Sequence, residues 1–594
     1  MTLNNSIWDI WIKNEALIPF QQVDEIMERR SKLGLTIAAS GFSAGILHAH
    51  AVGSLSPGLP LGTTIATVGL LVLVWSEQLS ISLSAIVTLG ALYRVVAFAI
   101  PPTLLNFDPD AHAVRSQIVL QTGSTKDLVG VFYGTAAAFD VHGAQIALLT
   151  GLPIDDAYVF YPLAIGVGIP LLALLAVNVL FRSIDLPTHS KRIGLGCAAI
   201  LAVVEATTIQ YGAAPVPVAY SALFLAAIVF TIVSFLPHRT WEFLTVLALF
   251  SAALLTSAKV PLLLFVAILS VWVVVDSVTS TQHPSPRQTP LTFTLLFGVL
   301  LALQWMYITE FFSFGAGALA VLTKLVIGEA ATRTPPAATP YSKGLLEKLL
   351  GLSNILSLLV AGGIAWLYIA ATRLSNESVK PLLAASAVTV AFIIPNLVFG
   401  SGPGFQRVFV YAVPFVCALI PTALLLALND NHPRLPIPYI PQGSAIVCGA
   451  IFLLVIANLG SMGATPDRVG GHRFYLTQSE VEGKHFTNAH ISDNVYMDMY
   501  YGDEVVNFQR AARGPEYHQY TVPHSWGRPL LSQELLTRNL IAQQYSYVAY
   551  RPTVDVYRLS GGRYRLMWDP GNVLDKHYYK VYSSGGSNIY RRPQ

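Results

Sequence analysis

The feature that most constrains this chain is a succession of apolar runs, each about 20 residues long, between residues 33 and 463. A helix of that length crosses the ~30 Å hydrocarbon core of a bilayer. Only 12% of the residues are charged, whereas a soluble domain carries about 25%. The sequence therefore predicts a polytopic α-helical membrane protein. About thirteen spans are expected, at residues 33–54, 62–77, 80–101, 157–181, 193–211, 215–236, 241–257, 260–278, 290–312, 350–372, 382–400, 406–428 and 443–462.

Basic residues in the short loops predict the topology. Cytoplasmic loops collect Lys and Arg, and the loop at 181–192 (FRSIDLPTHSKR) is the most informative. This loop falls on the cytoplasmic side, with the N-terminal ERRSK, only if the run 134–150 lies in the membrane interface and does not cross the membrane. We therefore expect a plasma-membrane protein whose two ends lie on opposite sides. Its expected parts are a cytoplasmic N-terminal segment (1–32), a transmembrane domain (33–463) with an outward loop (102–156), and an extracytoplasmic soluble domain (464–594).

The stretch TLLNFDPDAHAVRSQ is the most unusual part of the outward loop. It places Asp108, Asp110 and His112 within five residues of each other. Arg115 follows shortly after. Pro109 has a fixed φ and disfavours helix for the residue before it, so a short non-helical turn is expected here. A solvated turn that ends a helix is the alternative, since Asp and Pro are common in turns, but the density of ionisable groups favours a functional site.

Other ionisable residues are expected near the outer ends of the spans, where charge is costly and a functional role is the first hypothesis. Arg407 follows the glycine-rich turn GSGPGFQ, and a guanidinium suits bidentate phosphate binding. Arg94 and Lys259 are further candidates for phosphate binding, with snorkelling to lipid headgroups as the alternative. The residues expected to contact the acceptor or to support the site are His112, Arg115, Asp140, His142, Glu205 and Glu310.

A carboxylate opposed by cations at the outer membrane surface suits sugar transfer from a lipid phosphosugar. The carboxylate would take the proton of an acceptor hydroxyl, and Arg or Lys would stabilise the phosphate leaving group. Asp108, Asp110 and His112 are also adequate ligands for Mg²⁺ or Mn²⁺, so a divalent cation is a candidate cofactor. The net charge of +3 is too small to indicate a nucleic-acid partner. The three cysteines lie in apolar runs and predict neither a disulfide framework nor a zinc site.

Several longer stretches resemble archaeal members of the GT-C superfamily, which use polyprenyl-phosphate sugars. They are YRVVAFAIPPTLLNFDPDAHAVRSQIVLQTG, HGAQIALLTGLPIDDA, the GSGPGFQR turn and the tail LDKHYYKVYSSGGSNIYR. The resemblance implies an inverting hexosyltransferase, similar to the dolichyl-phosphate-mannose-dependent mannosyltransferases, that acts on an extracytoplasmic glycan or glycoprotein. It also implies Asp108 as the base or metal-associated carboxylate, Asp110 as its partner and Arg407 as the residue that holds the donor phosphate. Lys259 stands where related chains are expected to carry histidine.

The last 130 residues read as a small α/β or mostly β domain, because stretches such as YVAYRP and VDVYRL alternate and are separated by Gly-Gly turns. Its many Tyr and Arg residues suit docking of a glycan, whereas a structural cap packed on the outward loops is the interpretation that we favour. Two other functions are alternatives for the whole protein. A secondary transporter is expected to show an inverted repeat and charges at mid-helix depth, neither of which the sequence displays. A non-catalytic membrane assembly protein would leave the clustering of Asp108, Asp110 and Arg407 without a reason.

Overall fold

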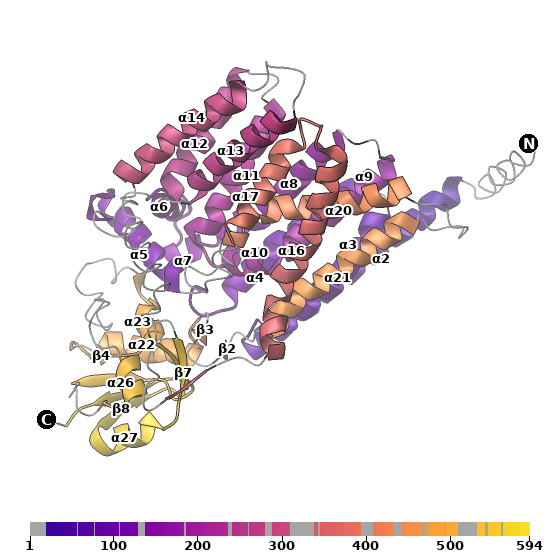
Figure 1. Cartoon of the computed structure of the whole chain (residues 1–594). Coiled ribbons are helices and arrows are strands. Elements are labelled where there is room, and N and C mark those ends of the chain that lie inside the picture. Colours follow the sequence, from indigo (N-terminus) through magenta and orange to yellow (C-terminus); the bar gives the residue numbers. More distant parts are fainter. Residues whose placement is uncertain are drawn as a thin grey trace, which may run out of the picture.

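The computed structural model describes residues 20–593 with several gaps. The gaps are residues 56, 77, 106, 129–136, 183, 185, 236–239, 259, 280–287, 309–337, 342–344, 394–407, 432–441, 465–467, 470–471, 474, 494, 509–530, 541–544 and 560–561. Figure 1 shows a bundle of long helices with a smaller, strand-containing C-terminal domain at one end of it. The predicted division into a helical membrane part and a small C-terminal α/β part is visible in this arrangement.

The bundle is built from the apolar runs of the sequence. In chain order it contains α2 (Phe20–Val52), α3 (Gly58–Trp75), α4 (Leu79–Ala99), α8 (Phe160–Arg182), α9 (Thr188–Val204), α10 (Ala206–Ala213), α11 (Pro217–Phe235), α12 (Trp241–Ser257), α13 (Pro261–Thr279), α14 (Gln288–Leu303), the π-helical turn η2 (Gln304–Ile308), α16 (Leu345–Arg373), α17 (Lys380–Ala391), α20 (Val413–Asn431) and α21 (Gln442–Ala464). One apolar core runs through most of these helices. Many of their remaining apolar side chains are exposed, as is expected of helices that face lipid.

The polytopic helical architecture is confirmed, but the thirteen expected spans are not. Within the described residues, nine helices are long and apolar enough to cross a membrane, or ten if α9 and α10 form one bent span. The helices α12, α17 and α20 are apolar but shorter. They occupy stretches where the sequence predicts spans: α12 has the predicted bounds, and residues 394–407 of the spans predicted around α17 and α20 lie outside the described residues.

Glycines let the helices of the bundle approach closely. A Cβ atom on Gly62 of α3 would lie 2.6 Å from the Cα atom of Gly45 on α2. A Cβ atom on Gly166 of α8 would lie 2.6 Å from the carbonyl oxygen of Gly90 on α4. Small residues at helix crossings are typical of membrane bundles, in which van der Waals packing drives association.

A group of shorter helices connects α4 to α8. It consists of α5 (Phe107–Thr122), the 3-10 turn η1 (Lys126–Leu128), α6 (Ala138–Thr150) and the single turn α7 (Ile154–Ala157). In Figure 1, α5, α6 and α7 lie at the side of the bundle that faces the C-terminal domain. The helix α6 has 13 residues and is about 20 Å long, shorter than the ~30 Å hydrocarbon core. This length agrees with the expectation that the run 134–150 does not cross the membrane.

The prediction of a non-helical turn at Asp108-Pro109-Asp110 is wrong. Helix α5 begins at Phe107, so all three residues lie in its first turn. A proline is tolerated there because the N–H groups of the first turn have no intrahelical partner. The two carboxylates also lie at the positive end of the helix dipole, where negative charge is favourable.

The C-terminal domain is a small α/β unit, as the sequence predicts. Its main sheet has the order β4-β5-β9-β8, in which β4 pairs parallel with β5 and the other pairs are antiparallel. Helices of the domain pack against the strands of its sheets. The elements are β2 (Arg468–Val469), β3 (His472–Arg473), α22 (Gln478–His490), β4 (Val495–Tyr496), α23 (Met499–Asp503), α26 (Leu531–Thr537), β5 (Tyr547–Tyr550), β6 (Val556–Leu559), β7 (Gly562–Leu566), α27 (Pro570–His577), β8 (Tyr579–Ser583) and β9 (Asn588–Arg591).

A strand from the middle of the chain joins this domain. Strand β1 (Ala338–Pro340) precedes α16 and pairs antiparallel with β7, with Ala338 opposite Leu566. The resulting sheet has the order β1-β7-β6. The range 464–594 predicted for the domain therefore leaves out one of its strands, because the pairing joins residues far apart in sequence.

Candidate functional site

The side chains of α5 and α6 meet in a buried histidine–carboxylate pair. The Nδ1 atom of His112 lies 2.7 Å from the Oδ1 atom of Asp140, and both residues are almost fully buried. The His112 ring packs edge-on against Phe139, at 5.2 Å between ring centroids. When Nδ1 donates its proton to the carboxylate, Nε2 is the basic nitrogen of the ring. The sequence singled out both residues, and the structure brings them together.

Close packing of the two helices makes this pair possible. The hydroxyl of Ser116 on α5 donates to the carbonyl oxygen of Asp140 at 2.7 Å and lies 2.8 Å from the hydroxyl of Tyr158. A Cβ atom on Gly143 of α6 would lie 2.7 Å from the Ser116 hydroxyl, so only glycine fits there. Ser116, Gly143 and Tyr158 are supporting residues that the sequence analysis missed, since nothing in their local pattern distinguishes them from ordinary helix residues.

The acidic pair of α5 is divided between two faces of the helix. Asp108 is half-buried and precedes His112 by four residues, about one turn, so these two share a face. Asp110 is rotated by about 200° from Asp108 and is fully buried. Its Oδ1 atom accepts a hydrogen bond from the backbone N–H of Val505, at 3.1 Å, in the C-terminal domain.

This division removes the expected metal site. Asp108, Asp110 and His112 were expected to hold a divalent cation, but that set required a turn that gathers all three side chains. Throughout the part of the chain that the structure describes, no group of three or more His, Cys, Asp or Glu residues is arranged to hold a metal ion. His112 faces Asp140 and Asp110 faces the C-terminal domain, so these residues do not fit Mg²⁺ or Mn²⁺ as a common ligand set.

Asp110 meets a second buried carboxyl group, Glu504. Burial raises the pKa of Asp110 well above its usual range, and the adjacent Glu504 raises it further. Burial also raises the pKa of Glu504, to about 8, while Thr103 and Lys484 act in the opposite direction. Two carboxyl groups in such a place favour retaining a proton. The sequence analysis missed Glu504, which lies in no motif.

Arg94 and Glu205 lie at a break in the bundle. The axes of α9 and α10 differ by 52° at Glu205, whose carboxylate accepts from the backbone N–H groups of Thr207 and Thr208 at 2.9 and 2.6 Å. The fully buried guanidinium of Arg94 donates to the carbonyl oxygens of Gly90, Val203 and Thr208 and to the Thr208 hydroxyl. Three of these four contacts go to Val203 and Thr208 beside the break, and the fourth goes to Gly90 on α4. A phosphate-binding role for Arg94 would require it to exchange them.

His142 and Arg115 border the same region. His142 on α6 is half-buried, its Nδ1 atom lies 3.1 Å from the Tyr220 hydroxyl, and the two rings stack at 5.5 Å between centroids. Burial lowers the pKa of His142. Arg115 on α5 has one terminal guanidinium nitrogen that is buried and finds no hydrogen-bond partner among the described residues. Arg115 is therefore a cation whose hydrogen-bonding capacity is not fully used.

Three expected site residues, Lys259, Glu310 and Arg407, lie outside the described residues. The expected approach of Arg407 to Asp108 and the expected positions of the other two therefore stay predictions.

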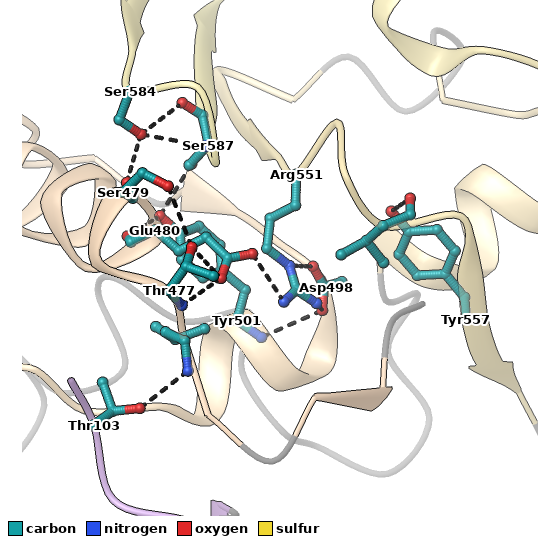
Figure 2. A network of polar contacts seen from close by, with 12 residues as sticks. Thr103, Thr477, Ser479, Glu480, Asp498, Tyr501, Arg551, Tyr557, Ser584 and Ser587 are labelled. Carbon is teal, nitrogen blue, oxygen red and sulfur yellow. Dashed lines mark hydrogen bonds and ion pairs between the residues drawn. The ribbon is translucent and has the colours of Figure 1, made fainter. Parts of the chain in front are cut away.

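A buried polar network stiffens the part of the C-terminal domain that meets α5 (Figure 2). The Arg551 guanidinium donates to both carboxylate oxygens of Asp498, at 2.8 and 2.6 Å, and lies 3.4 Å from Glu480. Glu480 also accepts from the backbone N–H of Thr477, at 2.8 Å, which caps α22. The Tyr501 hydroxyl on α23 donates to the carbonyl oxygen of Glu480. The network thus ties α22, α23 and β5 into one unit.

Comparison with models of known protein families finds none that matches this chain. No curated protein matches it in sequence either.

Proposed function

We propose that this protein is a membrane glycosyltransferase of the GT-C type, which transfers a hexose from a polyprenyl- or dolichyl-phosphate carrier to an extracytoplasmic glycan or glycoprotein. The observation that carries the proposal is the buried His112–Asp140 pair, one helical turn after the half-buried Asp108. This group lies where the apolar bundle meets a soluble domain (Figure 1). A lipid-linked donor and a water-soluble acceptor would meet at such a boundary. A plasma-membrane location, with the N-terminus cytoplasmic and the C-terminal domain outside, is part of the proposal.

In the proposed reaction, Asp108 accepts the proton of the acceptor hydroxyl as its oxygen attacks the sugar carbon. The bond between that carbon and the phosphate oxygen breaks, and its electron pair leaves on the phosphate. Attack from the side opposite to the phosphate inverts the configuration of the sugar carbon. His112, which shares a face of α5 with Asp108 and is oriented by Asp140 of α6, is placed to hydrogen-bond the acceptor or the sugar. No step is assigned to Mg²⁺ or Mn²⁺, because the expected ligands do not form a set.

The charge that builds on the leaving phosphate requires a cation. Arg407 and Lys259 remain the proposed residues for this role. Among the described cations, Arg115 supports the proposal better than Arg94 does. One buried nitrogen of Arg115 finds no partner in the described part, whereas Arg94 makes four hydrogen bonds to the protein.

The substitution Asp108→Asn tests the proposal, because it keeps the size of the side chain and removes the base. The purified variant should lose at least about 99% of transfer from a synthetic polyprenyl-phosphate hexose, as is typical when a general base is removed. The matched control is Asp156→Asn, which changes an exposed carboxylate on α7 in the same outward segment and should leave transfer intact. Full activity of Asp108→Asn would overturn the assignment. Mass spectrometry of surface glycans from a deletion strain would identify the sugar and the acceptor.

A secondary transporter is the second candidate, and the broken helix α9–α10 favours it. Transporters place discontinuous helices and buried charges at their substrate sites, and Glu205 is a fully buried carboxylate at such a break. Helix α9 has 17 residues, about 26 Å, so the break lies near one end of the span instead of its middle. Proton- or sodium-driven uptake into proteoliposomes that Glu205→Gln abolishes, with no sugar transfer, would favour the transporter.

A further inference from the structure

The C-terminal domain touches α5 through a built contact. The backbone N–H of Val505 donates to Asp110 at 3.1 Å. Val505 and Phe508 also pack into one apolar cluster with Ala113 of α5 and with Tyr158. A buried hydrogen bond and an apolar cluster that both cross from one part of the chain to the other indicate a fixed interface, not a passing approach.

The segment that makes this contact is held on its far side as well. The ammonium group of Lys484 on α22 donates to the carbonyl oxygens of Gly502 and Glu504 and is itself almost fully buried. It also lies 5.4 Å from the centre of the Tyr501 ring, which belongs to the network of Arg551 (Figure 2). Residues 501–505 therefore form a rigid edge, and α5 rests against that edge.

A third contact lies beside the first two. The backbone N–H of Leu476 donates to the hydroxyl of Thr103 at 3.0 Å. Figure 2 shows Thr103 on the segment that enters α5, facing the edge of the C-terminal domain. Glu504 also interacts with the Thr103 hydroxyl. The domain thus holds α5 at the helix and at the segment that precedes it.

The geometry of α5 links this contact to the candidate site. Asp110 points to the C-terminal domain, and Asp108 and His112 lie about 200° of rotation away from it. A helix held by one face cannot rotate without breaking that contact. The setting of Asp110 against Glu504 and Val505 therefore also sets the direction of Asp108 and His112.

We propose that the edge 501–505 of the C-terminal domain fixes the rotation of α5, through the contact of Val505 with Asp110 and Ala113, and so aims Asp108 and His112 at the site. Glu504, which precedes Val505 and is buried on this edge, is the positioning residue through which the proposal is tested. The effect on catalysis rests on the function proposed above, whereas the effect on α5 does not. The C-terminal domain is then a part of the site's framework instead of a cap.

The test compares Glu504→Ala with Glu504→Gln in the full-length protein in nanodiscs. The Ala variant removes the group that faces Asp110, and the Gln variant keeps its size and its hydrogen-bonding capacity. Amide hydrogen exchange should become about tenfold faster in residues 107–122 of the Ala variant, and kcat should fall about tenfold with the donor KM unchanged. In the Gln variant, both the amide exchange of residues 107–122 and kcat should equal those of the wild type. The matched control is Glu482→Ala, an exposed carboxylate on α22, which should change neither.

Each outcome decides a different point. Unchanged exchange in residues 107–122 of Glu504→Ala would overturn the positioning role, whatever the activity. Faster exchange with an unchanged kcat would show that α5 is held by the domain but that its setting does not matter for transfer, which also overturns the proposal. If exchange is faster in Glu504→Ala but the wild-type protein shows no transfer, the contact between the C-terminal domain and α5 is supported and the proposed function is refuted. If Glu504→Ala does not fold, the Glu504→Gln variant decides. Amide exchange in residues 107–122 of that variant that differs from the wild type would overturn the positioning role of Glu504.

Discussion

Alkaline pH should weaken the contact between α5 and the C-terminal domain. The ordinary pKa of a glutamate carboxyl group is 4.5, and burial raises the pKa of Glu504 in the folded protein to about 8. The folded protein therefore binds a proton more tightly than the unfolded chain does. The stabilisation is fully present below about pH 4.5, and it is lost as the pH rises through about 8.

The size of the effect follows from the same shift. A rise of the Glu504 pKa from 4.5 to about 8 corresponds to about 5 kcal/mol of folding free energy, at about 1.4 kcal/mol per pKa unit. This value is a ceiling, since water that reaches the ionised pair would reduce it. Asp110, whose pKa burial and Glu504 raise, titrates in the same direction, whereas Lys484 and Arg551 favour the ionised forms. About a third of that stabilisation is already lost between about pH 4.5 and about pH 6, so we expect the free energy of unfolding to fall by up to about 3 kcal/mol between about pH 6 and about pH 9.

Denaturant unfolding of the purified protein over that pH range measures the change, with amide exchange of residues 107–122 as the local readout. The Glu504→Gln variant is the reference, because its side chain cannot ionise and no longer repels Asp110. Its stability should depend much less on pH than that of the wild type. If the two proteins show the same pH dependence, the interpretation that burial keeps a proton on this pair of carboxyl groups is refuted.

Two further predictions concern buried guanidinium groups. Arg551→Met leaves Asp498 and Glu480 buried without their cation and should lower the free energy of unfolding of the C-terminal domain by about 3 to 5 kcal/mol. Arg565→Met, at an ion pair that is more than half exposed, should cost less than about 1 kcal/mol in the same denaturant titration, and equal losses in the two variants would contradict the reasoning. Arg94→Met removes four hydrogen bonds, three of them to residues beside the break between α9 and α10, and should lower the thermal midpoint in detergent by several degrees. A variant of unchanged thermal midpoint that had lost transfer would instead favour the phosphate-binding role of Arg94.

The helices of the bundle could be predicted because their signal is local. The length and hydrophobicity of a run decide whether it forms a membrane helix, and both are properties of consecutive residues. The predicted spans 80–101, 260–278 and 443–462 correspond closely to α4, α13 and α21. The predicted number of spans is larger than the nine or ten that the described residues support, because α12, α17 and α20 are short apolar helices within those residues. Helix α12 has its predicted bounds, and residues 394–407, which belong to the runs predicted around α17 and α20, lie outside the described residues.

Asp108, His112 and Asp140 could be singled out from the sequence because ionisable residues are rare in this chain. The local structure predicted for Asp108 and Asp110 was wrong. A turn was expected at Pro109, although a proline in the first turn of a helix is compatible with α5. That difference separates the two carboxylates, since a helix turns successive side chains by about 100°.

By itself, the sequence determined a helical membrane protein with a small α/β or mostly β domain at its C-terminus, and it marked the α5–α6 region as chemically unusual. Only the tertiary structure decided that Asp110 faces Glu504 and Val505 in a contact that joins residues 395 positions apart. It also decided that β1 completes a sheet of the C-terminal domain. The physical reason is that hydrophobicity and helix formation act over a few turns of chain, whereas the partner of a buried polar group depends on how distant segments pack.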